Sequence, residues 1–146
     1  MKLVCFSLLL GLTLPSVWSQ EWAQETVTLQ IGKHPIQAEI ADTPQSRKHG
    51  LSQRTALCPN CGMLFVFAQP DRYHFWMKNT PLPLSIAFIA ADGAILNIDE
   101  MQPNTSHTHS AQGNALYALE MNGGWFTRNG IQKGDVIHGL VQASPH

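Results

Sequence analysis

Two apolar runs joined by Asp-Gly constrain the fold of this chain more than any other feature of its sequence. The runs cover residues 84–90 and 94–98, and each has the length of a strand. Asp92 and Gly93 between them supply the positive φ angles that a tight hairpin turn needs. The sequence therefore predicts an antiparallel β-hairpin in the middle of the chain.

Further strands follow from apolar residues elsewhere. Val27, Leu29 and Ile31 alternate with polar residues, and the alternation resumes at 36–40, which predicts a second hairpin. Shorter apolar stretches predict strands at 63–67, 73–77, 114–121 and 136–141, the first two of them buried. The polar stretch 102–113 is expected to form an exposed loop.

Helix signals are few and short. Thr43 and Pro44 predict the start of a helix that Gly50 ends, and a helical turn is expected at 125–130. Six to eight strands with one or two short helices indicate a mainly β fold, a compact β-sandwich or barrel-like domain. A length of 146 residues leaves room for one domain, which we place at 20–146.

The N-terminus has the pattern of a cleavable export signal. Met1 and Lys2 precede an apolar run over 3–14, and small residues stand at Val17 and Ser19. We expect residues 1–19 to be removed as a signal peptide, so that the mature chain is periplasmic or secreted. The apolar run is shorter than the roughly 20 residues that cross a bilayer, and no membrane span is expected after cleavage.

Cys58 and Cys61 are the two cysteines that remain once Cys5 leaves with the signal. An even number suits an oxidising compartment. Their spacing fits a structural disulfide, a redox dithiol or half of a metal site. We expect the disulfide, because the sequence around them shows neither further zinc ligands nor a helix start.

Charge and motif content exclude several function classes. A formal net charge of -1 offers no basic face for phosphates, so nucleic acid is not an expected partner. The sequence has no Gly-x-Ser-x-Gly, phosphate loop or His-Glu-x-x-His, so common hydrolase and nucleotide chemistry lack support. We expect a monomer without a cofactor.

Several segments, in order, resemble one prokaryotic family, the domain of unknown function 192. The most specific is the string Trp-Met-Lys-Asn-Thr at 76–80; the others are 41–54, 62–67, 83–89, 92–93, 119–120 and 134–135. The resemblance implies a compact mainly β fold of sandwich or jelly-roll type and no assigned activity. Ser85 stands where the family usually has Asp, which puts in doubt any acid-base or metal role of that position here.

Polar residues in apolar surroundings make up the candidate ligand site: Arg47, Trp76, Lys78, Asn79, Thr80, Glu120 and Asp135. Charges in such surroundings need a partner, solvent or a ligand. One interpretation is a buried Lys78–Glu120 ion pair that fixes the fold, with Asp135 capping backbone amides in its turn. The other is a pocket in which Trp76 offers a flat apolar face.

The first choice of function is a non-enzymatic binding or accessory module of the cell envelope. Its partner would be an envelope protein, or a small polar ligand such as a carbohydrate or a small anionic molecule. One alternative is an enzyme with Glu120 or Asp135 as general base. Another is copper or redox handling through both cysteines together with His107, His109 and Met101, although no metal site is predicted.

Overall fold

A computed structural model describes residues 25–143, so the predicted signal peptide, residues 1–19, lies outside the described part. The fold is mainly β, as predicted. Its elements are β1 (Thr26–Ile31), β2 (His34–Ala41), α1 (Pro44–His49), β3 (Cys61–Asp71), β4 (His74–Phe75), β5 (Leu84–Ile89), β6 (Ile95–Met101), β7 (His109–Ser110), β8 (Ala115–Asn122), α2 (Trp125–Arg128) and β9 (Ile137–His138).

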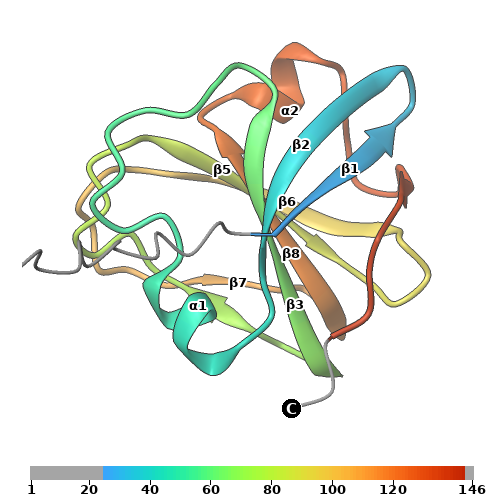
Figure 1. Cartoon of the computed structure of the whole chain (residues 1–146), viewed down its shortest axis with the longest axis horizontal. Helices are drawn as coiled ribbons and strands as arrows, with labels where there is room; N and C mark the ends of the chain where they lie inside the picture. Colours follow the sequence, from blue (N-terminus) through green and yellow to red (C-terminus); the bar gives the residue numbers. More distant parts are fainter. Residues whose placement is uncertain (1–24, 144–146) are drawn as a thin grey trace, which may run out of the picture.

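Seven strands form one curled sheet in the order β6-β5-β8-β3-β2-β1-β9, and β4 pairs with β7 in a small second sheet. Figure 1 shows the curl, with α1 and α2 toward opposite ends of the molecule. The two edges of the large sheet meet at a bridge between Ala94 and Val136. There the Ile95 N–H donates to the Asp135 carbonyl at 2.9 Å, so the two edges are joined at the start of β6.

Both predicted hairpins form. β1 pairs antiparallel with β2, and β5 pairs antiparallel with β6 around Gly93, whose φ is 89°. The sequence did not indicate that β2 and β3 pair in parallel, with α1 in the connection between them. A parallel pair needs such a crossover, and here it carries α1 to the sheet face that holds the candidate site.

The core lies on both faces of the large sheet because side chains alternate along each strand. On β3, Leu64 and Val66 join one apolar cluster, while Met63 and Phe65 join the other. On β8, Leu119 belongs to the first cluster and its neighbour Glu120 faces the second side. A carboxyl group therefore stands on an otherwise apolar face.

α1 is fixed at both ends by its own residues. Thr43 and Ser46 form a capping box, and Pro44 occupies the first turn. Gly50 ends the helix with a φ of 51°, and a Cβ atom there would lie 3.3 Å from the Phe65 ring. The chain thus turns back directly beside β3, and the residues of α1 come to lie against the second apolar cluster.

Three sequence-based expectations need correction. Residues 73–77 are not a buried strand: β4 is two residues long, and Trp76 is 62% exposed. The stretch 102–113 is not wholly an exposed loop, because β7 pairs with β4 and buries His109. The last strand is shorter than 136–141 because β9 pairs with β1 only at Gln30 and Ile31.

Candidate functional site

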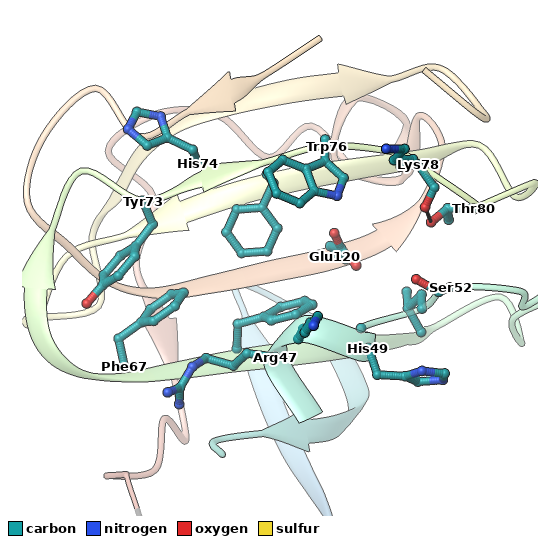
Figure 2. Close-up of a pocket in the computed structure, with 15 residues that line it drawn as sticks. Arg47, His49, Ser52, Phe67, Tyr73, His74, Trp76, Lys78, Thr80 and Glu120 are labelled. Atoms are coloured by element: carbon teal, nitrogen blue, oxygen red, sulfur yellow. Dashed lines mark hydrogen bonds between the residues drawn. The ribbon is translucent and has the colours of Figure 1, made fainter. Parts of the chain in front are cut away.

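A cavity of about 290 Å³ lies between the second face of the large sheet, α1 and the segment around β4. Figure 2 shows its lining side chains. They are Arg47, Lys48, His49, Gly50, Leu51, Ser52, Phe65, Phe67, Tyr73, His74, Phe75, Trp76, Lys78, Thr80 and Glu120. Aromatic rings form the sides of the cavity, cationic side chains stand at its mouth and one carboxyl group is buried in its wall.

The aromatic walls of this cavity hold one another in place. Phe65 and Phe75 meet edge to face with ring centroids 4.9 Å apart, and Phe67 stacks on Tyr73 at 3.5 Å. The Tyr73 hydroxyl donates to the Gln69 carbonyl at 2.6 Å. Burial raises the pKa of Tyr73, with Asp71 adding to the rise and Arg47 opposing it, so the hydroxyl stays neutral. These contacts make the walls a preformed apolar surface.

Glu120 supplies the one carboxyl group of the cavity lining. Its cross-strand neighbours are Met63 on β3 and Ile86 on β5, and only 5% of the residue is exposed. No side chain between residues 25 and 143 donates a hydrogen bond to its carboxyl or pairs with it. Burial raises the pKa of Glu120 to about 8, so at neutral pH the group is an acid with one O–H to donate.

Arg47 lines the cavity, but its guanidinium is already engaged. Its Nη1 donates to the Val66 carbonyl at 2.9 Å and to the Asp42 carbonyl, and the guanidinium lies 5.5 Å from the centre of the Phe67 ring. In Figure 2 the guanidinium points away from Glu120. Arg47 therefore fastens α1 to the middle of β3, and its guanidinium is part of the cavity wall and not a free donor.

Lys78 and Glu120 line the same cavity but do not form the predicted ion pair. Lys78 is exposed, and no hydrogen bond or ion pair to its ammonium exists in the described part of the chain. The expectation assumed that Lys78 is buried beside Trp76, whereas the segment after β4 leaves both side chains at the mouth of the cavity. An ammonium in water needs no partner.

Of the remaining predicted site residues, one lines the cavity and two do not. The Thr80 side chain is buried and lines the cavity, close to Lys78 (Figure 2). Asn79 does not line it: with a φ of 57° it turns the chain, and its carbonyl accepts from the Gln53 N–H at 2.8 Å. Asp135 lies at the seam of the sheet, where its carboxylate accepts from the Gln132 N–H at 2.8 Å. That is the capping role considered for it.

Cys58 and Cys61 are joined in a disulfide away from the cavity lining. The loop that they close is anchored at Asn60. Its carbonyl accepts from the Gln37 N–H at 2.9 Å, and its Oδ1 accepts from Trp125 Nε1 at 3.1 Å. These bonds tie the loop to β2 and α2, which is the arrangement expected of a structural disulfide.

The candidate metal ligands are only partly brought together. The rings of His107 and His109 are 4.4 Å apart, and His109 Nδ1 lies 3.5 Å from Asp99 Oδ2. Met101 packs in the second apolar cluster. Within residues 25–143, no group of three or more His, Cys, Asp or Glu side chains is placed to hold a metal ion.

Sequence reasoning missed most of the cavity wall. Phe65 and Phe67 share a face of β3 with Met63, whose cross-strand partner is Glu120, so strand alternation carried a signal for them. Lys48, His49 and Ser52 carried none. They reach the cavity because of the turn at Gly50.

Comparisons with known proteins identify a family and solved structures with a similar fold. The family model DUF192, described as "Uncharacterized ACR", matches residues 27–139. A Sinorhizobium meliloti 1021 structure, provisionally described as a transcription regulator, is 36% identical with a TM-score of 0.74, covering 80% of this chain and 94% of its own. A Novosphingobium aromaticivorans protein of unknown function is 37% identical with a TM-score of 0.73, covering 77% and 83%. No curated protein matches.

Proposed function

We propose, for a chain that belongs to the DUF192 family, that it is a small-ligand binding module of the cell envelope whose site is the aromatic cavity beneath Trp76. One observation carries the proposal. The Glu120 carboxyl is buried in an apolar wall of this cavity and has no partner within residues 25–143. Because Glu120 lines the cavity, a ligand in the cavity can accept the hydrogen bond of this carboxyl group.

The ligand would be a small polar molecule or a carbohydrate that rests its apolar face on Trp76. This side chain and Val136 are the large apolar side chains that stand exposed in the described part of the chain. Aromatic faces open to solvent are common at sites that bind cyclic ligands. Trp76 also lines the cavity, whereas Val136 does not.

A screen of small cyclic molecules by amide NMR of the mature protein tests this proposal. Shifts caused by a binding molecule should cluster at residues of the cavity wall. Trp76→Ala should weaken binding, and Val136→Ala, the matched loss of an exposed apolar side chain elsewhere, should leave it unchanged. Shifts that avoid the cavity, or equal effects of the two variants, would contradict the proposal.

Enzyme activity is the second candidate, and the raised pKa of Glu120 is the observation that favours it. A general acid or base works best when its pKa lies near the working pH. Glu120→Gln separates the two functions. The amide keeps a hydrogen-bond donor but cannot transfer a proton, so an enzyme would lose turnover and keep binding, whereas a binding module would keep its function in the cell.

We also propose that the chain is exported. The charged start, the short apolar run and the small residues before Gln20 support a cleaved signal, and the Cys58–Cys61 disulfide is consistent with an oxidising compartment. No helix within residues 25–143 is long and apolar enough to cross a membrane. The description of one relative as a transcription regulator suggests DNA binding as a further function. The net charge of -1 argues against this function for the present chain.

A further inference from the structure

The mouth of the cavity carries charges of one sign. Its lining includes three permanent cations, Arg47, Lys48 and Lys78, and no carboxyl group besides the buried Glu120. Arg47 is engaged by backbone carbonyls. The ammonium groups of Lys48 and Lys78 are exposed and have no partner within residues 25–143. A cleft lined by one sign of charge with apolar walls concentrates ligands of the opposite sign.

The floor of the cavity presents a donor and not a negative charge. Because burial keeps the Glu120 carboxyl protonated near neutral pH, it offers an O–H donor to the cavity that it lines. A carbonyl or carboxylate oxygen of a ligand can accept this hydrogen bond. A cationic amine would require the carboxyl to ionise in its apolar wall, and it would have to pass Lys48 and Lys78.

The volume of the cavity limits the size of a ligand that could reach from the cationic mouth to Glu120. At about 290 Å³ it is at the small end of ligand sites, which commonly range over roughly 300 to 1,000 Å³. Phe65, Phe75 and Trp76 contribute apolar surface to it. A single ring with a polar group at each end is therefore a better match than a long chain or a large sugar.

We propose that the cavity selects small organic anions built on one ring: Lys48 and Lys78 hold the anionic group at the mouth, and the Glu120 carboxyl donates a hydrogen bond to an oxygen at the other end. This inference rests on the proposed function, since it requires the cavity to be a ligand site. It names the ligand class that the charges and the donor select.

Three probes of one shape separate the ligand classes. Monomethyl terephthalate carries a carboxylate opposite its ester carbonyl, methyl 4-carbamoylbenzoate carries a neutral amide there, and methyl 4-(aminomethyl)benzoate carries an ammonium. Titration calorimetry of the mature protein at pH 7 measures each affinity. The carboxylate should bind about tenfold more tightly than the amide, because two charge contacts are lost together, and the ammonium should bind most weakly.

Variants locate the contacts. Lys48→Gln and Lys78→Gln should each weaken carboxylate binding by about threefold and leave amide binding unchanged. Lys33→Gln removes the same charge from the β1–β2 turn, outside the cavity, and serves as the matched control. Glu120→Gln should keep most of the affinity because its amide still donates. Glu120→Leu should lose affinity for all probes that bind through the ester carbonyl.

The outcomes that overturn the inference differ from those that overturn the proposed function. Equal binding of the carboxylate and the amide would show a site for neutral ligands, and tightest binding of the ammonium would show a cation site. Either result removes the inference and keeps the cavity as a ligand site. If none of the probes binds at millimolar concentration, the inference fails; the proposed function fails as well if no molecule of the cyclic screen shifts a cavity resonance.

Discussion

Glu120 places a carboxyl group at a buried position where the surrounding side chains are apolar. Its neighbours across the sheet are Met63 and Ile86, positions where an apolar side chain would pack without cost. The carboxyl group is accommodated by remaining protonated, as its raised pKa indicates. A residue that lowers stability at physiological pH while facing a cavity is characteristic of a site that serves a ligand.

The stability of the protein should therefore depend on pH through Glu120. The pKa is about 8 in the folded state against 4.5 for an unperturbed group. The folded pKa is the higher one, so the protonated carboxyl contributes its full share of stability below about pH 4.5. This contribution is lost as the pH rises toward 8. The amide side chain of the Glu120→Gln variant does not titrate. The unfolding free energy of this variant, relative to that of the wild type, should therefore rise by roughly 1.4 kcal/mol per pH unit in this window.

Urea unfolding of both proteins at several pH values between 4 and 9 measures this gain. The other titratable groups of the lining are common to both proteins and cancel in the difference: Arg47, Lys48, His49, Tyr73, His74 and Lys78. Glu25→Gln, an exposed carboxyl changed in the same way, is the control. A constant difference between Glu120→Gln and wild type across the whole range would contradict a neutral buried acid.

Gly62 is a second residue whose identity is set by close packing. A Cβ atom at this position would lie 2.3 Å from the backbone oxygen of Glu120. Gly62→Ala should therefore destabilise the protein by about 3 kcal/mol or more, because β3 and β8 must separate. Gly113→Ala is the control, since its Cβ would meet Leu96 at an ordinary 3.5 Å. Equal unfolding midpoints for the two variants would contradict this account.

At the scale of elements, the site depends on segments that lack regular structure of their own. β4 is two residues long and is held by β7, through pairs His74–Ser110 and Phe75–His109. The side chains of His74 and Ser110 add a contact of 2.7 Å between Nδ1 and Oγ. The aromatic wall and Trp76 are thereby placed against the large sheet by a pairing that spans more than thirty residues of sequence.

The disulfide loop should contribute modestly to stability. Because the ring between Cys58 and Cys61 is small, replacing both residues with Ser should lower the unfolding free energy by about 2 kcal/mol. The wild type measured under reducing conditions is the matched comparison and should give the same value. Thiol labelling of the native mature protein should find no free cysteine.

A redox role for the pair makes a different prediction. A Cys61→Ser variant would then trap a mixed disulfide between Cys58 and a partner protein, detectable on non-reducing gels. The hydrogen bonds that hold Asn60 to Gln37 and Trp125 favour a fixed loop instead. Recovery of such an adduct from cells would replace the structural interpretation.

At the scale of the whole molecule, the curled sheet has one face filled by an apolar cluster and another face that contains the cavity. One apolar cluster, which includes Trp125 and Phe126 of α2, fills one face of the sheet. The other face is covered by α1 and the segments around β4, and it contains the cavity. The seam near Asp135 lies apart from the cavity lining, so the closure of the sheet and the candidate site involve different residues.

Export is a prediction about the whole chain. The product recovered from the periplasm or the medium should begin at Gln20, because the sequence before it has the features of a cleaved signal. Intact mass spectrometry decides this directly. A membrane-bound product that retains residues 1–19 would contradict both the location and the count of two mature cysteines.

Much of the fold was predictable because its signals are local. Asp92 and Gly93 determine a hairpin turn, Thr43 and Pro44 start α1, and alternation marks β1 and β2. The same alternation placed Glu120 among apolar neighbours. The parallel pairing of β2 with β3 was not predictable, because neither strand carries a sequence signal that identifies its neighbour in the sheet.

The sequence by itself determined the strands of both hairpins, their turns, α1 and the presence of a carboxyl group in the apolar strand β8. Only the tertiary structure decided which residues share a cavity. Glu120 and Asp135 are near in sequence, yet one faces the cavity and the other caps a turn at the seam. Lys78 reaches solvent and not Glu120. Periodicity specifies the face of a strand on which a side chain lies, but what covers that face depends on contacts between distant segments.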